Sequence, residues 1–160
     1  MARHVTRSAV QSIGIISDTH GLVRPEALAA LRGSDVIIHA GDVGNPAVLE
    51  ELRGVAPVVA VRGNNDRGAW AATLPETEVV EIDGTLLYVL HDVHELDVNP
   101  AAAGFRAVIS GHSHRPSLRE DGGVLFLNPG SAGPRRFTLP IALARLHLRN
   151  GQLSGEIVEL

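Results

Sequence analysis

Five short polar segments of this chain each follow an apolar run, and they carry side chains that bind metal ions in proteins. They supply aspartate, asparagine and histidine, and the candidate ligands are Asp18, His20, Asp42, Asn64, His91, His112 and His114. Because the carboxyl ends of parallel strands meet at one edge of an α/β sheet, we expect these loops to converge on one cleft. The set is larger than a single ion needs, so the sequence predicts a polynuclear metal site.

The chemistry of such a site depends on a carboxylate between two ions. Two divalent ions about 3.5 to 4 Å apart need a bridging carboxylate, together with imidazole and amide donors that limit the negative charge. Asp42 is the natural bridging residue in this set.

The spacing within the segments also bears on the site. Gly41, Gly63 and Gly111 each precede a candidate ligand, and we expect them to let the backbone turn sharply. In Asp18-Thr19-His20 and His112-Ser113-His114, an extended backbone would point the two outer side chains in the same direction.

At individual positions, interpretations other than metal binding also have to be considered. An isolated Asp-x-His or Gly-Asp after a strand is usually turn chemistry, whereas paired histidines at this spacing are costly to bury without a metal. His39 lies inside an apolar run and is interpreted as a buried, hydrogen-bonded histidine. His91 is preferred to His94 as a ligand, because it directly ends the run 86–90.

The helices and strands that must position these residues are predicted from prolines and glycines at their ends and from the pattern of apolar residues. Proline and glycine delimit helices at 26–32 and 47–53 and a shorter piece from Asn99 to Gly104. Apolar runs at 13–17, 36–40, 57–62 and 107–110 are predicted to be central strands. Asp83-Gly84 and Asn150-Gly151 favour two-residue hairpin turns, between 79–82 and 85–90 and between 141–149 and 153–159. The sequence therefore predicts an α/β fold with two mixed sheets.

Composition narrows the classes of function. With 160 residues and 44% hydrophobic residues the chain is expected to be one domain over residues 12–160, preceded by a flexible tail at residues 1–11. There is no cysteine and no lysine, which excludes thiolate metal sites, cysteine nucleophiles and Schiff-base chemistry. A net charge of −4 argues against nucleic acid as a partner. No apolar run is long enough for a membrane span or a secretory core, so a cytoplasmic location is expected.

The ordered motifs resemble the calcineurin-like metallophosphoesterase superfamily, and in particular its small single-domain YfcE-like phosphodiesterases. The residues that carry the resemblance are Asp18-x-His20, Gly41-Asp42, Gly63-Asn64, His91, Gly111-His112-x-His114 and Asn128-Pro129-Gly130-Ser131. The resemblance implies a four-layer α/β/β/α sandwich that holds two divalent metal ions. It also implies that the first ion is bound by Asp18, His20 and His114, the second by Asn64, His91 and His112, and both by Asp42.

The third motif departs from the family pattern. Many relatives have Gly-Asn-His or Gly-Asn-Cys-Asp there, whereas this chain has Gly63-Asn64-Asn65-Asp66. The missing histidine removes an obvious proton donor, so no catalytic side chain is assigned and the expected nucleophile is a metal-bridging hydroxide. Asn64, Asn65 and Arg67 are expected to contact the substrate, with Arg67 as a clamp for phosphate. Asp66 is expected to orient an imidazole ring or the loop.

These observations predict a phosphodiesterase with two divalent ions that acts on a small phosphoester. Mn²⁺ is the first expectation for the metal, and Fe, Ni²⁺ and Zn²⁺ also suit oxygen and imidazole ligands. The alternatives are a phosphomonoesterase and a catalytically silent protein-binding scaffold on the same fold, as the resemblance to the eukaryotic retromer subunit suggests. The intact ligand set favours the enzyme. A homodimer through the exposed face of the C-terminal hairpin is a further expectation.

Overall fold

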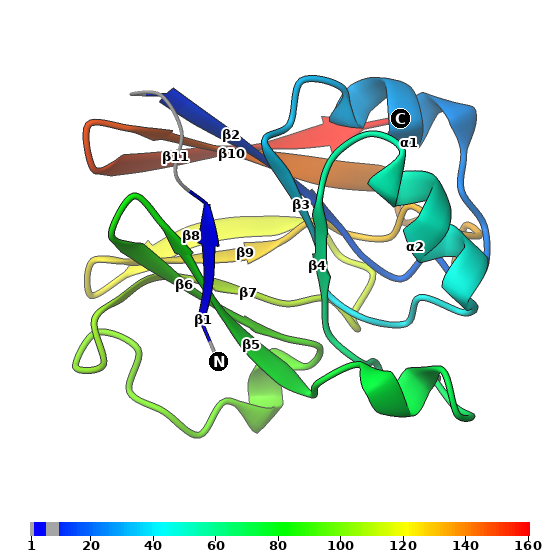
Figure 1. Cartoon of the computed structure of the whole chain (residues 1–160), viewed down its shortest axis with the longest axis horizontal. Helices are drawn as coiled ribbons and strands as arrows, with labels where there is room; N and C mark the ends of the chain where they lie inside the picture. Colours follow the sequence, from blue (N-terminus) through cyan, green and yellow to red (C-terminus); the bar gives the residue numbers. More distant parts are fainter. Residues whose placement is uncertain (1, 6–9) are drawn as a thin grey trace.

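Two mixed β-sheets make up most of the molecule (Figure 1). The computed structural model describes residues 2–5 and 10–160. The five-stranded sheet has the order β11 (Gln152–Glu159), β10 (Ala142–Arg149), β2 (Val10–Ile16), β3 (Val36–His39) and β4 (Val58–Ala60). The six-stranded sheet has the order β1 (Ala2–Val5), β5 (Thr77–Ile82), β6 (Thr85–Leu90), β7 (Phe105–Ile109), β9 (Val124–Asn128) and β8 (Ser117–Asp121). The prediction of two mixed sheets is confirmed.

The main core lies between the facing sheets. Ile15 and Ile38 from the five-stranded sheet meet Leu87 and Ile109 from the six-stranded sheet in one fully buried cluster. The next residue along β2, Ile16, points to the opposite face, where it joins a second buried cluster under the helices. The strands β2 and β3 are therefore buried on both faces, as their continuous apolar runs predict.

The outer faces of the two sheets are covered differently. The helices α1 (Pro25–Leu31) and α2 (Pro46–Arg53) pack on the five-stranded sheet, and the 3₁₀ turn η1 (Ala71–Thr73) lies nearby (Figure 1). The six-stranded sheet is covered by the 3₁₀ turn η2 (Val93–Glu95) and the chain leading to β7, whose apolar side chains pack on Tyr88 and Val108. Within the described ranges, none of the helices has the length and apolar character that a membrane crossing requires.

The predicted helices and hairpins are confirmed with one exception. α1 and α2 begin at the prolines, and Asn45 caps α2 by accepting a hydrogen bond from the Ala47 N–H. Both predicted hairpins form, with Asp83 and Asn150 in the left-handed conformation that such turns require. The predicted short helix from Asn99 to Gly104 is wrong: the segment forms hydrogen-bonded turns before β7, because Gly104 ends it before a regular helix is established.

The beginning of the chain differs from the expected loose tail where the structure describes it. Residues 2–5 form β1, which pairs in parallel with β5, and Gln11 belongs to β2. The edge of β5 offers free backbone groups, and pairing with them orders this segment. The remaining residues of the predicted tail, 1 and 6–9, lie outside the described residues.

Candidate metal centre

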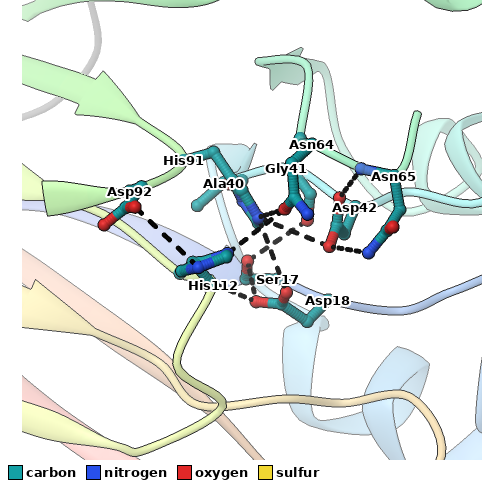
Figure 2. Close-up of polar contacts among 12 residues, drawn as sticks. Ser17, Asp18, Ala40, Gly41, Asp42, Asn64, Asn65, His91, Asp92 and His112 are labelled. Carbon is teal, nitrogen blue, oxygen red and sulfur yellow. Dashed lines mark hydrogen bonds and ion pairs between the residues drawn. The ribbon is translucent and has the colours of Figure 1, made fainter. Parts of the chain in front are cut away.

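The polar loops after five strands meet at one end of the two sheets, as the sequence predicts. Asp18, Asp42 and Asn64 follow β2, β3 and β4 of one sheet, while His91 and His112 follow β6 and β7 of the other. Figure 2 shows the side chains of these five residues pointing toward one another. The site is thus built where the carboxyl ends of strands from both sheets converge.

One group of donors is formed by Asp18, His20 and His114. Their ligand atoms lie within 4.8 Å of one another, and Asp18 and His114 are buried. The Nε2 atoms of His20 and His114 are 3.4 Å apart, and His114 Nε2 is 3.4 Å from Asp18 Oδ1. These three residues are the set expected for the first ion.

A second group is formed by Asp18, Asp42 and His91, whose ligand atoms also lie within 4.8 Å of one another. Asn64 adjoins this group, since its Oδ1 is 3.0 Å from His91 Nε2 and 3.2 Å from His112 Nδ1. The structure therefore brings together all four residues expected for the second ion, and it adds an oxygen of Asp18 to them.

Asp18 carries the clearest sign that a cation fits here. Its Oδ2 accepts hydrogen bonds from the Ser17 hydroxyl at 2.7 Å and from the His112 N–H at 3.0 Å. Its Oδ1 is buried and has no hydrogen-bond partner in the described part of the chain. The Nε2 atoms of His114, His20 and His91 surround Oδ1 at 3.4, 3.9 and 3.9 Å. A buried carboxylate oxygen without a donor is costly, and a metal ion among these nitrogens would remove that cost.

Asp42 and His91 are each held by a second partner. Asn65 donates its backbone N–H to Asp42 Oδ1 at 2.8 Å and its side-chain amide to Asp42 Oδ2 at 3.0 Å. His91 Nδ1 donates to the Ala40 carbonyl at 2.7 Å, which directs Nε2 toward Asp42 Oδ2 at 3.4 Å. Partners of this kind fix the orientation and tautomer of metal ligands.

The charges of the site shift the pKa values of its members. Burial alone would raise the pKa of Asp18 and of Asp42, but hydrogen bonds and the nearby imidazoles outweigh it and hold both below the ordinary range. Burial would lower the pKa of His91, yet Asp42 and Asp18 raise it to about 8. The two carboxylates thus favour the protonated form of His91 in the metal-free protein, and a metal ion bound at Nε2 would replace that proton.

The backbone at the ligands differs from the extended form expected for Asp18-x-His20 and His112-x-His114. All four outer residues have left-handed φ angles, of 54° and 48° at Asp18 and His20 and of 71° and 62° at His112 and His114. At Asp18 and His20 this form accompanies loop pairing, since their N–H groups donate to the carbonyls at 41 and 42. Such φ angles cost about 1 to 2 kcal/mol per residue, and they cluster at functional sites.

The glycines beside the ligands are needed for different reasons. Gly41 has a φ of 102° and turns the chain as expected. Gly111 has no such φ, and instead a Cβ at this position would lie 2.0 Å from Ser17 Oγ and 2.6 Å from Asp18 Oδ2. Gly63 is equally close to Asp42. The expectation of a sharp turn is thus corrected at positions 63 and 111, where it is the close approach of the carboxylate that requires glycine.

Buried polar residues behind the ligands hold the loops in place. Asp66 accepts from the N–H groups of Val43, Gly44 and Gly63, so it orients the loop rather than a ring. His39 is fully buried, with Nδ1 accepting from the Gly41 N–H and Nε2 at 2.9 Å from Thr19 Oγ1. The interpretation of His39 as a buried, hydrogen-bonded histidine is confirmed, and burial lowers its pKa to about 4.

The last motif supports the site from the other sheet. Asn128 donates its side-chain amide to the Gly111 carbonyl at 2.8 Å and to Ser113 Oγ at 3.1 Å. Ser131 donates its hydroxyl to the Asp18 carbonyl at 2.9 Å. Ser17 is the supporting residue that sequence reasoning missed, because a serine at the end of an apolar strand carries no distinctive pattern.

The three residues expected to contact substrate do not share one environment. Asn64 is exposed and contacts His91 and His112, whereas the amide of Asn65 is bound to Asp42. Arg67 is exposed, and in the described part of the chain no hydrogen bond or ion pair joins it to the donor groups. His94 is exposed and bound to Asp92, so it lies outside the ligand groups. Asp92 Oδ2 is 3.8 Å from His112 Nε2, where it faces that imidazole without a direct hydrogen bond.

Known proteins are similar to this chain in sequence and in fold. A model of the calcineurin-like phosphoesterase superfamily domain matches residues 12–151. A probable metallophosphoesterase of Methanothermobacter thermautotrophicus is 37% identical over 158 residues, which cover 91% of each chain. Among solved structures, an archaeal phosphodiesterase aligns with a TM-score of 0.78 at 24% identity, over 92% of this chain and 100% of that one. Vacuolar protein sorting 29 of Cryptosporidium parvum aligns with a TM-score of 0.73 at 19% identity, over 96% and 99% of the two chains.

The two kinds of similarity have different weight. The two solved structures, at these identities, show only that the fold is shared, and they confirm the predicted metallophosphoesterase fold. The family model and the archaeal relative match in sequence over nearly the whole chain, and they agree with the donor groups described above. The chain therefore belongs to the calcineurin-like phosphoesterase superfamily, and this membership supports a hydrolase that acts on phosphoesters.

Proposed function

We propose that this chain is a phosphodiesterase that works with two divalent metal ions. The observation that carries the proposal is the position of Asp42 Oδ2, which lies 3.8 Å from His20 Nε2 and 3.4 Å from His91 Nε2. One oxygen thus faces an imidazole of each donor group, as a residue shared between two ions must.

The residues that would hold the ions follow from the two groups. Asp18, His20 and His114 would bind the first ion, Asn64, His91 and His112 the second, and Asp42 both. Asp18 is the residue that the two donor groups have in common, so its Oδ1 would also adjoin the second ion. When bound, such ions supply Lewis acidity toward phosphoryl oxygens and a bound water. The chain's own contribution is to hold the two carboxylates ionised and fixed, through Ser17 and the His112 N–H at Asp18 and through Asn65 at Asp42.

The surroundings of the site favour a diester over a monoester. Two cavities of about 260 and 390 Å³ adjoin Asp92 and His112, and both residues line both cavities. A phosphodiester carries an organic group on each side of the phosphorus, so two cavities beside one metal site match its two arms. Asn64 and the exposed Arg67 are the groups we assign to the phosphate itself.

The test is turnover by chelator-stripped protein as Mn²⁺ is titrated back. Initial rates are measured for bis(p-nitrophenyl) phosphate and, in parallel, for p-nitrophenyl phosphate, with Fe²⁺, Ni²⁺ and Zn²⁺ in further series. We expect metal-dependent hydrolysis with a higher kcat/KM for the diester. A preference for the monoester would assign the site to a monoesterase. If none of the metals gives turnover, the protein-binding scaffold becomes the better proposal.

A further inference from the structure

The two cavities beside His112 differ in charge. The smaller one, of about 260 Å³, is lined by Arg115 and Arg119 and by the apolar side chains of Phe126 and Leu127. We call it the arginine pocket. The larger cavity contains Glu76, Glu95 and Asp97, and its single arginine, Arg62, is paired with Glu76 at 3.0 Å. Asp92 belongs to both, so the arginine pocket has a net positive lining and its neighbour a negative one.

Arg119 is held in a defined position in the arginine pocket. Its guanidinium lies over the ring of Phe126, with Cζ 4.3 Å from the ring centroid. Its contact with Asp121, at 3.7 Å, joins two exposed side chains and is weak. A stacked guanidinium keeps its N–H groups free at the edges, and its outer face can stack on another planar group.

Arg115 enters the same pocket from the loop that carries the metal-site histidines. Its backbone N–H donates to Ser113 Oγ, and Ser113 in turn accepts from Asn128, which fixes the start of this segment. Within residues 2–5 and 10–160, no hydrogen bond or ion pair engages the Arg115 guanidinium. A cation without a carboxylate partner, next to a second cation in one cavity, is suited to an anionic ligand.

The size of the pocket limits what it can hold. Its volume is near the lower end of small-molecule sites, which span about 300 to 1,000 Å³. Phe126, Leu127 and Val93 supply apolar wall, while the two guanidinium groups supply charge. A planar ring bearing a sugar and a phosphate combines these properties in one small group.

We propose that the arginine pocket is a subsite for one ester arm of the substrate, and that it selects an arm carrying a nucleoside with a second phosphate group. Arg115 and Arg119 bind that second phosphate, and the apolar wall with the stacked Arg119 receives the ring. The inference rests on the proposed phosphodiesterase function, since it assigns one arm of the diester. The negative neighbouring cavity opposes binding of the same arm there.

The experiment compares two probes that differ by one phosphate. They are the p-nitrophenyl ester of thymidine 5′-phosphate and the same ester carrying an additional 3′-phosphate. The kcat/KM ratio of the two is measured with Mn²⁺ for the wild type, Arg115→Ala and Arg119→Ala. The matched control is Arg149→Ala, an exposed arginine at the end of β10. We expect the wild type to have a higher kcat/KM for the 3′-phosphorylated probe. In the two pocket variants the ratio of the two kcat/KM values should fall about tenfold, and in the control it should stay unchanged.

A binding measurement separates the subsite from the catalytic proposal. Thymidine 3′,5′-bisphosphate is titrated by calorimetry into the metal-free wild type and the same variants. A Kd weakened about tenfold in Arg115→Ala and Arg119→Ala, but not in Arg149→Ala, supports the subsite even if no diester is hydrolysed. In that case the proposed function fails, and the arginine pocket stands as a binding site for a nucleoside with two phosphate groups. Equal Kd values in all four proteins, or no binding at millimolar concentration, would overturn the subsite whatever the rates show.

Discussion

Asn65 holds both carboxylate oxygens of Asp42, with its backbone N–H 2.8 Å from Oδ1 and its side-chain amide 3.0 Å from Oδ2. The sequence led us to expect Asn65 at the phosphate, because histidine occupies this position in many relatives. In the structure its amide orients the carboxylate that faces both donor groups. Asn65 is thus a positioning residue in the metal-free protein.

Replacing Asn65 with alanine should weaken metal binding without unfolding the protein. The variant loses the donor to Asp42 Oδ2 and keeps the backbone donor to Oδ1. Loss of such a supporting contact typically costs about ten- to a hundredfold in metal affinity. Calorimetric titration with Mn²⁺ measures the affinity, and Asn99→Ala, in an exposed turn, is the control. An unchanged Mn²⁺ affinity in Asn65→Ala would show that the contact does not position Asp42.

The order of elements could be predicted from the sequence because local chemistry determines it. Asp83-Gly84 and Asn150-Gly151 form hairpin turns wherever they lie between strands, and Pro25 and Pro46 begin helices for reasons within their own turns. The hairpin of β8 and β9 was missed, although Gly122 and Gly123 lie at its turn. Its strand β8 is exposed along its whole length and shows no alternation of apolar and polar residues.

The detailed form of the site could not be predicted, because it depends on contacts between distant segments. The candidate ligands could be named from their chain order, since each follows a strand. The left-handed backbones of Asp18, His20 and Asp42 occur where the loop at Asp18 pairs with the loop at Asp42, 24 residues later. The partner of the Asn65 amide is likewise set by where Asp42 lies in space. Spacing along the sequence contains no information about either contact.

Asp42→Asn should abolish turnover while leaving the fold intact. The change removes the negative charge that faces both donor groups and keeps nearly the same shape. We expect kcat/KM for a diester to fall at least about a thousandfold. The number of bound Mn²⁺ ions, measured by elemental analysis after dialysis, should fall below that of the wild type. Asp83→Asn, in the β5–β6 turn, is the matched control, since asparagine suits that turn equally well. A wild-type rate in Asp42→Asn would refute the bridging role.

Gly111→Ala should damage the site through a clash rather than through backbone strain. The new Cβ would lie 2.0 Å from Ser17 Oγ and 2.6 Å from Asp18 Oδ2, so the carboxylate must move. Overpacking of this kind costs about 1 to 3 kcal/mol of folding stability, and we expect metal affinity to fall with it.

Gly104→Ala separates the clash from the loss of glycine. Gly104 has a φ of 86° with no atom near its missing Cβ, so this variant suffers backbone strain alone. Urea unfolding and Mn²⁺ titration of both variants make the comparison. The expectation is that Gly104→Ala loses about 1 kcal/mol of stability and keeps its metal affinity. Equal Mn²⁺ affinity in the two variants would contradict the role assigned to Gly111.

The buried His39 should make the protein less stable in mild acid. Its folded-state pKa of about 4 lies below the unfolded value near 6.5, because burial disfavours the charged ring. As the pH falls from 6.5 toward 4, His39 becomes protonated in the unfolded chain but stays neutral in the folded protein, so the free energy of unfolding decreases. A full shift of this size corresponds to roughly 3 kcal/mol.

Urea unfolding in chelator at pH 7.5, 6.5, 5.5 and 4.5 tests this dependence on His39. We expect the wild type to lose stability steadily below pH 6.5, and His39→Gln, which cannot titrate, to lose much less across the same interval. The low pKa values of Asp18 and Asp42 begin to act below about pH 5, where unfolded carboxyl groups start to take up protons. The raised pKa of His91 contributes stability that is complete below pH 6.5 and is lost as the pH rises toward 8. The change in the free energy of unfolding between pH 6.5 and 4.5 is therefore assigned mainly to His39. His147→Gln is the control, and it should show the same change as the wild type. If His39→Gln also shows that change in full, the assignment to His39 is refuted.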